Sequence, residues 1–191
     1  RWSEHIAPDW AGRSHADLER LFADLDGIAP QEPEKQGRFK LSYYAGADID
    51  HAALCARMQA RLQDAGVRAS VVWSVDETSM TGLLDVLPAA ATKLGAVRFL
   101  MSELGIAETD TLFAGDSGND LPVLTSGLPA VLVANATAEV RAQALRHAPA
   151  NGRLYCAHGG FMGMNGNYAA GVLEGLAHFH PDLAAWLDAA G

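Results

Sequence analysis

The sequence predicts an α/β protein in which a parallel, doubly wound (Rossmann-like) sheet is joined to a smaller α/β domain. From residue 83 onward, apolar segments of strand length alternate with segments of helical periodicity, which is typical of a parallel sheet covered by helices. Residues 38–75 form a separate strand–helix–strand pattern of modest size. The pattern changes near Met80–Gly82, so we expect two domains, residues 1–82 and residues 83–191.

Composition and charge narrow the possible functions. The chain has 191 residues, 49% of them hydrophobic, and a net charge of −9, a composition typical of a soluble globular protein. No block of basic residues occurs, so the electrostatic footprint of a nucleic-acid-binding protein is absent. An acidic surface does not attract phosphate esters. Any bound phosphate must therefore be held by local donors and a cation.

The sequence indicates neither a membrane segment nor an oxidising compartment. No apolar run reaches about 18 residues, so no transmembrane helix is expected. Cys55 and Cys156 are the only cysteines and lie far apart, which favours a cytoplasmic location over a disulfide scaffold. A monomer and an oligomer of unknown size both stay open.

The first domain is expected to begin with helix. Within residues 1–30, apolar residues recur at intervals of three and four from Leu18 to Leu25, and Ser14 is the expected N-cap. A polar segment with a proline, residues 31–37, ends this region.

A strand, a helix and a second strand follow. Residues 38–44 alternate polar with apolar side chains and predict a strand. Asp48 or Asp50 is expected to cap a helix that ends at Gly66. The apolar stripe of this helix is Leu54, Met58 and Leu62, and residues 67–75 alternate again as a half-exposed strand.

The second domain is expected to alternate strands and helices. The predicted strands are residues 83–87, 111–115, 129–134 and 153–157, and the predicted helices are residues 89–104, 121–125, 137–145, 168–179 and 181–190. The helix over residues 89–104 is expected to turn Val97, Leu100, Met101 and Leu104 inward. The glycine-rich loop 158–167 is expected to be a mobile flap or a linker.

Residues 111–120, Thr-Leu-Phe-Ala-Gly-Asp-Ser-Gly-Asn-Asp, are the most informative stretch. An apolar strand runs into Gly115 and Asp116, and Asp120 follows four positions later. The carboxyl end of a strand is where ligands bind in an open α/β sheet. Hard cations such as Mg²⁺ take oxygen ligands, usually one or two carboxylates with water and substrate phosphate. The stretch therefore predicts a Mg²⁺ site formed by Asp116 and Asp120.

Lys93 is the second marker. It lies 116 − 93 = 23 residues before Asp116, which leaves room for one helix and one strand. Residues 83–87 are expected to form a parallel strand of the same sheet, so a right-handed crossover brings the end of that strand and Asp116 to one edge. Lys93 begins the intervening helix, so its ammonium is expected at that edge.

These features resemble a known family. Residues 111–120 are similar to motif IV of the haloacid dehalogenase (HAD) superfamily of phosphohydrolases. The wider match is to the sucrose-phosphate phosphatase family, whose small cap domain precedes the second half of the core. The matching segments are Gln31–Gln36, Phe39–Tyr44, Leu84–Pro88 with Lys93, Gly115–Asp120 and Ala134–Ala136.

The resemblance implies a Mg²⁺-dependent phosphatase that hydrolyses a sugar phosphate, sucrose 6-phosphate above all, through an aspartyl-phosphate. Lys93 matches the lysine that pairs with the phosphoryl oxygens, Asp116 the acidic Mg²⁺ ligand, and Asp120 its companion. Asn119 matches a residue beside the phosphoryl group. Gln36, Lys40 and Ser42 match the part of the cap that reads the sugar, with Trp73 or Tyr43 as an expected stacking surface.

The nucleophile motif Asp-x-Asp-x-Thr is not found where the family has it. The only candidate, Asp24–Gly27, follows residues of helical period and is expected to be a helix end. Because the sequence starts at Arg1, we expect a chain that begins after the first two motifs, without roughly 80 residues of a typical domain of this class.

Several alternatives stay open. The enzyme could be a phosphatase of glucosylglycerate, mannosylglycerate or trehalose phosphates, or a phosphomutase on the same fold. The non-enzyme alternative is an inactive sugar-binding remnant. Asp85 is expected to be structural, and the spacing of Cys156, His158, His178 and His180 fits no usual zinc pattern.

Overall fold

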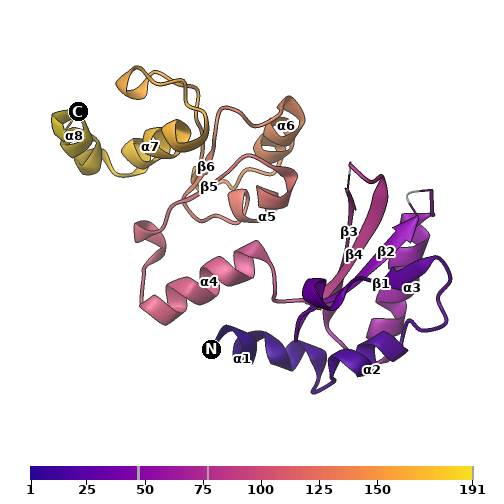
Figure 1. Ribbon diagram of the computed structural model, residues 1–191. Coiled ribbons are helices and arrows are strands. Elements are labelled where there is room, and N and C mark those ends of the chain that lie inside the picture. Colours follow the sequence, from indigo (N-terminus) through magenta and orange to yellow (C-terminus); the bar gives the residue numbers. More distant parts are fainter. Residues whose placement is uncertain (47, 77, 191) are drawn as a thin grey trace. The chain divides into compact units, whose positions relative to one another are not determined.

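The computed structural model describes residues 1–46, 48–76 and 78–190. The chain divides into two compact units, Arg1–Thr92 and the remainder from Lys93 onward (Figure 1). We call these unit 1 and unit 2. Within the described ranges, no helix combines the length and apolar character needed to cross a membrane.

Unit 1 is built on an antiparallel sheet of four strands in the order β1-β2-β4-β3. The strands are β1 (Ile28–Pro30), β2 (Leu41–Gly46), β3 (Ala69–Asp76) and β4 (Thr81–Pro88). The helices are α1 (Trp2–Ile6), α2 (His15–Arg20) and α3 (His51–Asp64), with 3-10 turns η1 (Ala7–Trp10) and η2 (Pro33–Lys35). The predicted N-caps are confirmed. The side chain of Ser14 accepts a hydrogen bond from the backbone N of Asp17, and the side chain of Asp50 accepts one from the backbone N of Ala53.

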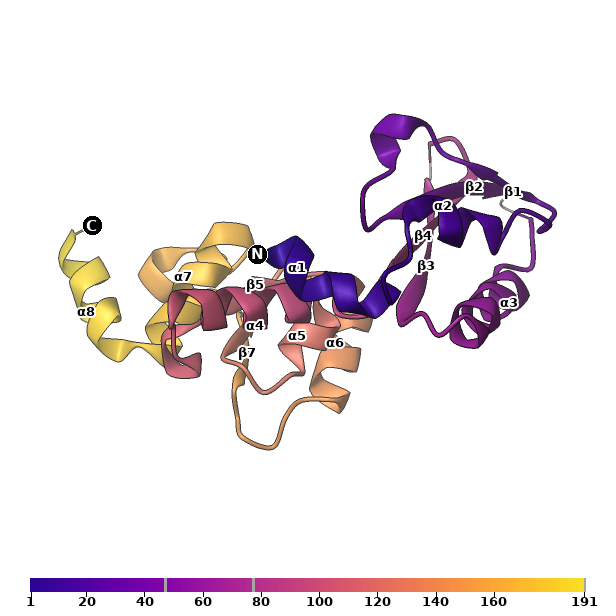
Figure 2. The same ribbon diagram turned by 90° about the horizontal axis from the view of Figure 1, so that it is seen from below.

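One face of this sheet forms the core of unit 1. The predicted stripe of α3, Leu54, Met58 and Leu62, is fully buried against it. Helix α2 packs on the same core through Leu18 (Figure 2). The other face carries the alternate residues of the strands, among them Ser42, which lies opposite Asp85.

Strand β4 corrects two sequence-based expectations. Residues 83–87 were predicted to begin the parallel sheet of the second domain, but β4 pairs with β2 and β3 on either side, antiparallel to both. The boundary between the units consequently lies between Thr92 and Lys93, rather than between residues 82 and 83. A strand paired on both sides cannot be separated from its sheet without breaking both hydrogen-bond ladders.

Unit 2 contains a parallel sheet of three strands in the order β5-β6-β7. The strands are β5 (Phe113–Gly115), β6 (Ala130–Leu132) and β7 (Leu154–Cys156). The helices are α4 (Lys93–Leu104), α5 (Leu121–Leu124), α6 (Ala138–Arg146), α7 (Tyr168–Phe179) and α8 (Pro181–Ala190), with 3-10 turns η3 (Glu108–Asp110), η4 (Gly118–Asp120) and η5 (Phe161–Gly163).

Helices cover both faces of the parallel sheet, as predicted for a doubly wound fold. Helices α5 and α6 pack on the face that carries Ala130 and Leu132. Helix α7 packs on the opposite face at Val131, where the absence of a side chain at Gly175 allows close approach. A Cβ at Gly175 would lie 2.1 Å from Cγ2 of Val131. The central strand β6 is therefore buried on both sides.

Helix α4 differs from its prediction. It begins at Lys93 rather than at residue 89, because a turn follows Pro88. None of its residues is fully buried. Leu100 and Leu104, expected to face inward, are 56% and 61% exposed.

Candidate active site

The carboxyl ends of two parallel strands bring the candidate groups of unit 2 together. Asp116 directly follows β5, and the turn η4 returns the chain so that Asp120 lies beside it. Asn135 follows β6, the neighbouring strand. Neighbouring parallel strands end at one edge of the sheet, so all three side chains gather there.

Asp120 organises this turn. Its Oδ2 accepts hydrogen bonds from Ser117 Oγ at 2.8 Å, from Ser117 N at 3.1 Å and from Asp116 N at 3.2 Å. Its Oδ1 accepts from Lys93 Nζ at 2.5 Å. Burial by itself would raise the pKa of Asp120, but the hydrogen bonds from Lys93, Ser117 and the backbone outweigh it and hold the pKa below its usual value. Asp120 is therefore an ionised carboxylate with both oxygens engaged.

Gly115 makes room for this carboxylate. A Cβ at Gly115 would lie 2.6 Å from Cγ of Asp120, closer than any real contact. At Gly115, the space is taken by the side chain of Asp120, whereas a Cβ at Gly118 would meet nothing within 4 Å.

Lys93 reaches the site by a different route from the one predicted. The predicted crossover started from residues 83–87, which belong to the other sheet. Lys93 instead opens α4 within unit 2, and its ammonium pairs with Asp120 while the side chain stays 53% exposed. The ammonium is thus held at the site and is still open to a ligand.

Asp116 has one carboxylate oxygen available. Its Oδ2 accepts from Asn135 Nδ2 at 2.8 Å, and among the described residues no hydrogen bond or ion pair uses its Oδ1. A free carboxylate oxygen is the donor type that Mg²⁺ takes. Over residues 1–46, 48–76 and 78–190, no three His, Cys, Asp or Glu side chains are grouped to hold a metal. A cation at Asp116 would therefore take its remaining ligands from water and phosphate oxygens, as Mg²⁺ usually does.

Asn119, the other predicted residue of this loop, is exposed on η4. Its side chain makes no hydrogen bond to any described residue. It is therefore free to meet a ligand at the same edge.

Unit 1 brings two of the three predicted sugar-reading residues together around Asp85. Asp85 Oδ1 accepts from Lys40 Nζ at 2.7 Å and from Ser42 Oγ at 2.6 Å. Lys40 and Asp85 line a hollow of about 280 Å³, to which Gln31 and Tyr44 also contribute. Ser42 is fully buried and is not part of its lining. All of its lining residues except Leu83 carry polar side chains, and Lys40 and Asp85 keep about a third of their side-chain surface exposed, 38% and 32%.

Gln36 lies elsewhere and is fully engaged. Its Nε2 donates to the carbonyl oxygens of Gln31 at 3.0 Å and Ser42 at 2.8 Å, and its Oε1 accepts from Ser42 N at 2.8 Å. The side-chain amide thus bonds to both backbone groups of Ser42, as the backbone of a neighbouring strand would. Its polar groups hold the fold of unit 1 and are not turned towards the Asp85 hollow.

The two aromatic candidates for stacking on a sugar are also occupied. Tyr43 is 3% exposed and packs edge-on against Phe22; burial raises its pKa. The ring of Trp73 stacks on His51 with centroids 5.1 Å apart, and its edge covers Gly82. Both rings are part of the packing of unit 1.

Asp24, the candidate nucleophile, forms a two-pronged ion pair with Arg61 of α3. It lies in the turns that follow α2, which agrees with its interpretation as a helix end.

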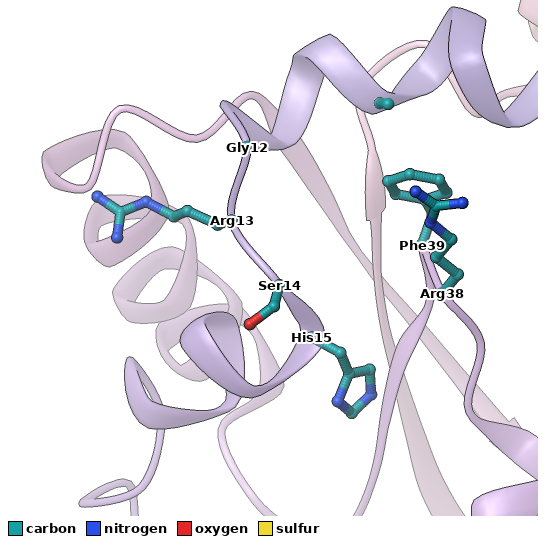
Figure 3. Close-up of a pocket in the computed structure, with 7 residues that line it drawn as sticks. Gly12, Arg13, Ser14, His15, Arg38 and Phe39 are labelled. Carbon is teal, nitrogen blue, oxygen red and sulfur yellow. The ribbon is translucent and has the colours of Figure 1, made fainter.

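A larger hollow of about 370 Å³ lies near the start of α2, lined by Arg13, His15, Arg38 and neighbours. Figure 3 shows that its two arginines do not converge. The guanidinium of Arg13 donates to the carbonyl of Ala65, and that of Arg38 lies over the ring of Phe39. The two guanidinium groups therefore do not point towards one ligand position.

The sequence did not indicate that Asn135 bonds to Asp116, or that Asp85 bonds to Lys40 and Ser42. Asn135 was seen only as part of a family motif, and Asp85 only as structural. For Asn135, its place just after a parallel strand adjacent to that of Asp116 was an available signal. For Asp85, the signal needed was the pairing of β2 with β4, which the sequence does not give.

Comparisons with known proteins show the family to which the chain belongs. A family model described as sucrose-6F-phosphate phosphohydrolase matches residues 1–180. A putative HAD-like hydrolase from Nitrosococcus oceani is 55% identical over 98% of this chain and 51% of its own length. Mannosylfructose-phosphate phosphatase from Agrobacterium fabrum is 32% identical over 93% of this chain and 64% of its own length.

A solved structure is also similar. The sucrose-phosphatase from Synechocystis sp. PCC6803, in complex with sucrose and phosphate, matches with a TM-score of 0.66 and 25% identity, over 93% of this chain and 66% of that one. The chain thus spans between about half and two thirds of the length of these relatives. It belongs to the sucrose-6F-phosphate phosphohydrolase family, within the haloacid dehalogenase superfamily.

Proposed function

We propose that this chain supplies the sugar-reading domain and the cation-binding edge of a Mg²⁺-dependent phosphatase that hydrolyses sucrose 6-phosphate to sucrose and phosphate. The observation that carries the proposal is the gathering of Lys93, Asp116 and Asp120 at the ends of parallel strands, with Lys93 Nζ 2.5 Å from Asp120 Oδ1. Family membership supports the reaction class. In this proposal unit 1 is the cap, and unit 2 is the C-terminal part of the hydrolase core.

Each group in unit 2 has a separate task in the proposal. Asp116 holds the cation through its free Oδ1, and Asp120 supports it through water, because both oxygens of Asp120 already accept hydrogen bonds. Bound Mg²⁺ supplies positive charge opposite the phosphoryl oxygens. The ammonium of Lys93 stabilises the negative charge that those oxygens carry in the transition state. Asn119 offers an amide beside them.

The nucleophile is not assigned to a residue of this chain. Membership of the family implies a carboxylate that attacks phosphorus, so that the bond from phosphorus to the sugar oxygen breaks and an aspartyl-phosphate forms. A neighbouring acid gives its proton to the leaving oxygen, and water later releases phosphate. Asp24 does not fit this role, because Arg61 holds both of its oxygens.

Lys40, Ser42 and Asp85 are proposed to recognise the sugar. An ammonium, a hydroxyl and a carboxylate within hydrogen-bond reach of one another can exchange their mutual bonds for bonds to sugar hydroxyls. The hollow that Lys40 and Asp85 line is large enough for part of a sugar ring, and the buried Ser42 holds Asp85 from beneath. Gln36 supports these residues by holding the backbone of Ser42.

A second substrate is favoured by one relative. Mannosylfructose-phosphate phosphatase matches 93% of this chain at 32% identity. Mannosylfructose phosphate is therefore the second candidate substrate.

The test measures phosphate release from sucrose 6-phosphate, mannosylfructose phosphate and trehalose 6-phosphate, with Mg²⁺ and with chelator. It uses the chain and, where the reading frame extends upstream of Arg1, the product of the longer frame. Sucrose 6-phosphate is expected to be hydrolysed fastest. Asp116→Ala should lose more than about 100-fold in kcat/KM, whereas Asp110→Ala, an exposed aspartate of the same unit, should retain full activity.

Asp85→Asn is expected to raise KM more than it lowers kcat, with exposed Asp64→Asn as its control. Intact turnover in Asp116→Ala would remove the cation assignment. Sugar binding without hydrolysis of any sugar phosphate would instead identify a sugar-binding remnant.

A further inference from the structure

The side chain of Asn135 joins two separate parts of unit 2. Its Nδ2 donates to Asp116 Oδ2 at 2.8 Å. Its Oδ1 accepts from the backbone N of Tyr168 at 2.8 Å. Tyr168 is the first residue of α7. One amide therefore connects the carboxylate after β5 with the start of the helix that covers the sheet.

The chemistry of the amide suits this position. An asparagine side chain carries a donor and an acceptor on one planar group, so it can donate to a carboxylate and accept from a backbone amide at once. An aspartate would lose the donor, and an aliphatic residue would lose both bonds. The bond to Oδ2 leaves Oδ1 of Asp116 without a partner among the described residues.

The backbone that Asn135 binds is itself held firmly. Ala134 N donates to the carbonyl of Gly166 at 2.9 Å, two residues before Tyr168. Gly166 in turn packs directly on Gly159, since a Cβ there would lie 2.6 Å from Gly159 N. The loop 158–167, expected to be a mobile flap or a linker, is thus anchored at Gly159 and Gly166.

A buried carboxylate completes this anchoring. Glu174 of α7 is 5% exposed, and it accepts from the backbone N of His158 and of Gly159, each at 2.9 Å. Tyr155 of β7 donates its hydroxyl to the same carboxylate at 2.8 Å. These bonds hold the start of the loop that leads to Tyr168, whose backbone N donates to Asn135 Oδ1.

We infer that Asn135 is a positioning residue for the cation at Asp116. It fixes the carboxylate in the orientation that leaves Oδ1 free, and it couples cation binding to the start of α7. The inference rests on the proposed function, in which Asp116 is the cation ligand. Asn135 acts through Asp116 and touches neither the cation nor the substrate.

The affinity of the chain for Mn²⁺, followed by electron paramagnetic resonance, tests this directly. Asn135→Ala should weaken binding roughly 10-fold, the effect typical of losing a partner that orients a metal ligand. Asn151→Ala is the matched control, because Asn151 also bridges backbone groups, donating to Gly127 O and accepting from Arg153 N. Its Mn²⁺ affinity should equal that of the unchanged chain.

A second measurement needs no substitution. In the unchanged chain, the nuclear magnetic resonance signals of the Asn135 side-chain amide and the Tyr168 backbone amide should shift as Mg²⁺ is added. The midpoint of these shifts should fall at the Mg²⁺ concentration that half-saturates the site. The side-chain amide of Asn151 should not shift. If Asn135→Ala fails to fold, this titration still decides, since unmoved signals of Asn135 and Tyr168 overturn the inference.

Asp116→Ala separates the two ideas. If it binds Mn²⁺ as tightly as the unchanged chain, the cation site of the proposed function is wrong, and the positioning role of Asn135 is wrong as well. If Asp116→Ala loses binding while Asn135→Ala stays within about twofold of the unchanged chain, the cation site stands and only the role of Asn135 is overturned.

Discussion

Gly115 is the residue whose missing side chain allows Asp120 to lie buried beneath the turn. A Cβ at this position would come within 2.6 Å of the Asp120 side chain. We expect Gly115→Ala to cost roughly 1–3 kcal/mol in the free energy of unfolding of unit 2, the usual cost of overpacking. The carboxylate of Asp120 should also be displaced from Lys93. Urea unfolding with Mn²⁺ affinity measured alongside checks both effects.

Gly118→Ala is the matched control for this change. It lies three residues further along the same loop, and an added Cβ would meet nothing within 4 Å. We expect a change in unfolding free energy within about 0.5 kcal/mol. Equal stability of the two alanine variants would show that the space at Gly115 is not what holds Asp120.

At the residue scale, the sequence identified groups whose roles depend on near neighbours. The interval from Asp116 to Asp120 is one tight turn, so the motif itself places Asp120 within hydrogen-bond reach of the backbone of Asp116. The side-chain amide of Gln36 could bond to sugar hydroxyls, but its Nε2 already donates hydrogen bonds to the backbone carbonyls of Gln31 and Ser42. Whether a polar group is already satisfied depends on residues folded against it, and sequence does not report that.

At the element scale, helices were predicted better than strand partners. Helix α7 has the predicted bounds, and Ser14 and Thr137 cap the helices that follow them. Capping and periodicity are local signals. Strand β4 alternates buried and half-buried residues in the structure, yet Leu83 to Leu87 are apolar in both phases apart from Asp85. Its apolar run fits either a parallel or an antiparallel sheet, so the pairing was not readable.

Helix α7 and the loop before it give a prediction that depends on pH. Burial by itself would raise the pKa of Glu174, but the hydrogen bonds from His158, Tyr155 and Gly159 and the charge of His158 hold the pKa below its usual value. A lowered folded pKa contributes stability that is complete above the unfolded value of about 4.3 and is lost as the pH falls through the folded value. Glu174→Gln should therefore cost roughly 1–2 kcal/mol near neutral pH.

The stability difference between the unchanged chain and Glu174→Gln should shrink as the pH is lowered below about 4. Chemical unfolding at a series of pH values measures it. Glu139→Gln on α6 is the control, since within the described part of the chain that exposed carboxylate accepts only from Gln143, one turn away. A difference between the unchanged chain and Glu174→Gln that is constant from neutral to acid pH would contradict the lowered pKa of Glu174.

At the scale of the whole molecule, the two units bury their apolar residues differently. Unit 1 has one continuous core, in which Trp10, Phe22 and Leu54 are at most 2% exposed. Unit 2 has two smaller groups, one on each face of its sheet. Beside the sheet, Leu100 and Ile106 help to line an apolar hollow of about 320 Å³. The free energy gained by burial should therefore be larger for unit 1.

This asymmetry predicts how the two pieces behave when they are produced separately. Residues 1–92 should unfold in one cooperative thermal transition, followed by circular dichroism. Residues 93–191 should unfold at lower temperature and bind the dye ANS more strongly, because Leu100 and Leu104 are more than half exposed. Replacing both leucines with lysine should reduce ANS binding without lowering the transition temperature, whereas Leu124→Lys, at a fully buried position, should abolish the transition. A sharp transition and weak ANS binding in the piece 93–191 would show instead that its two small cores suffice.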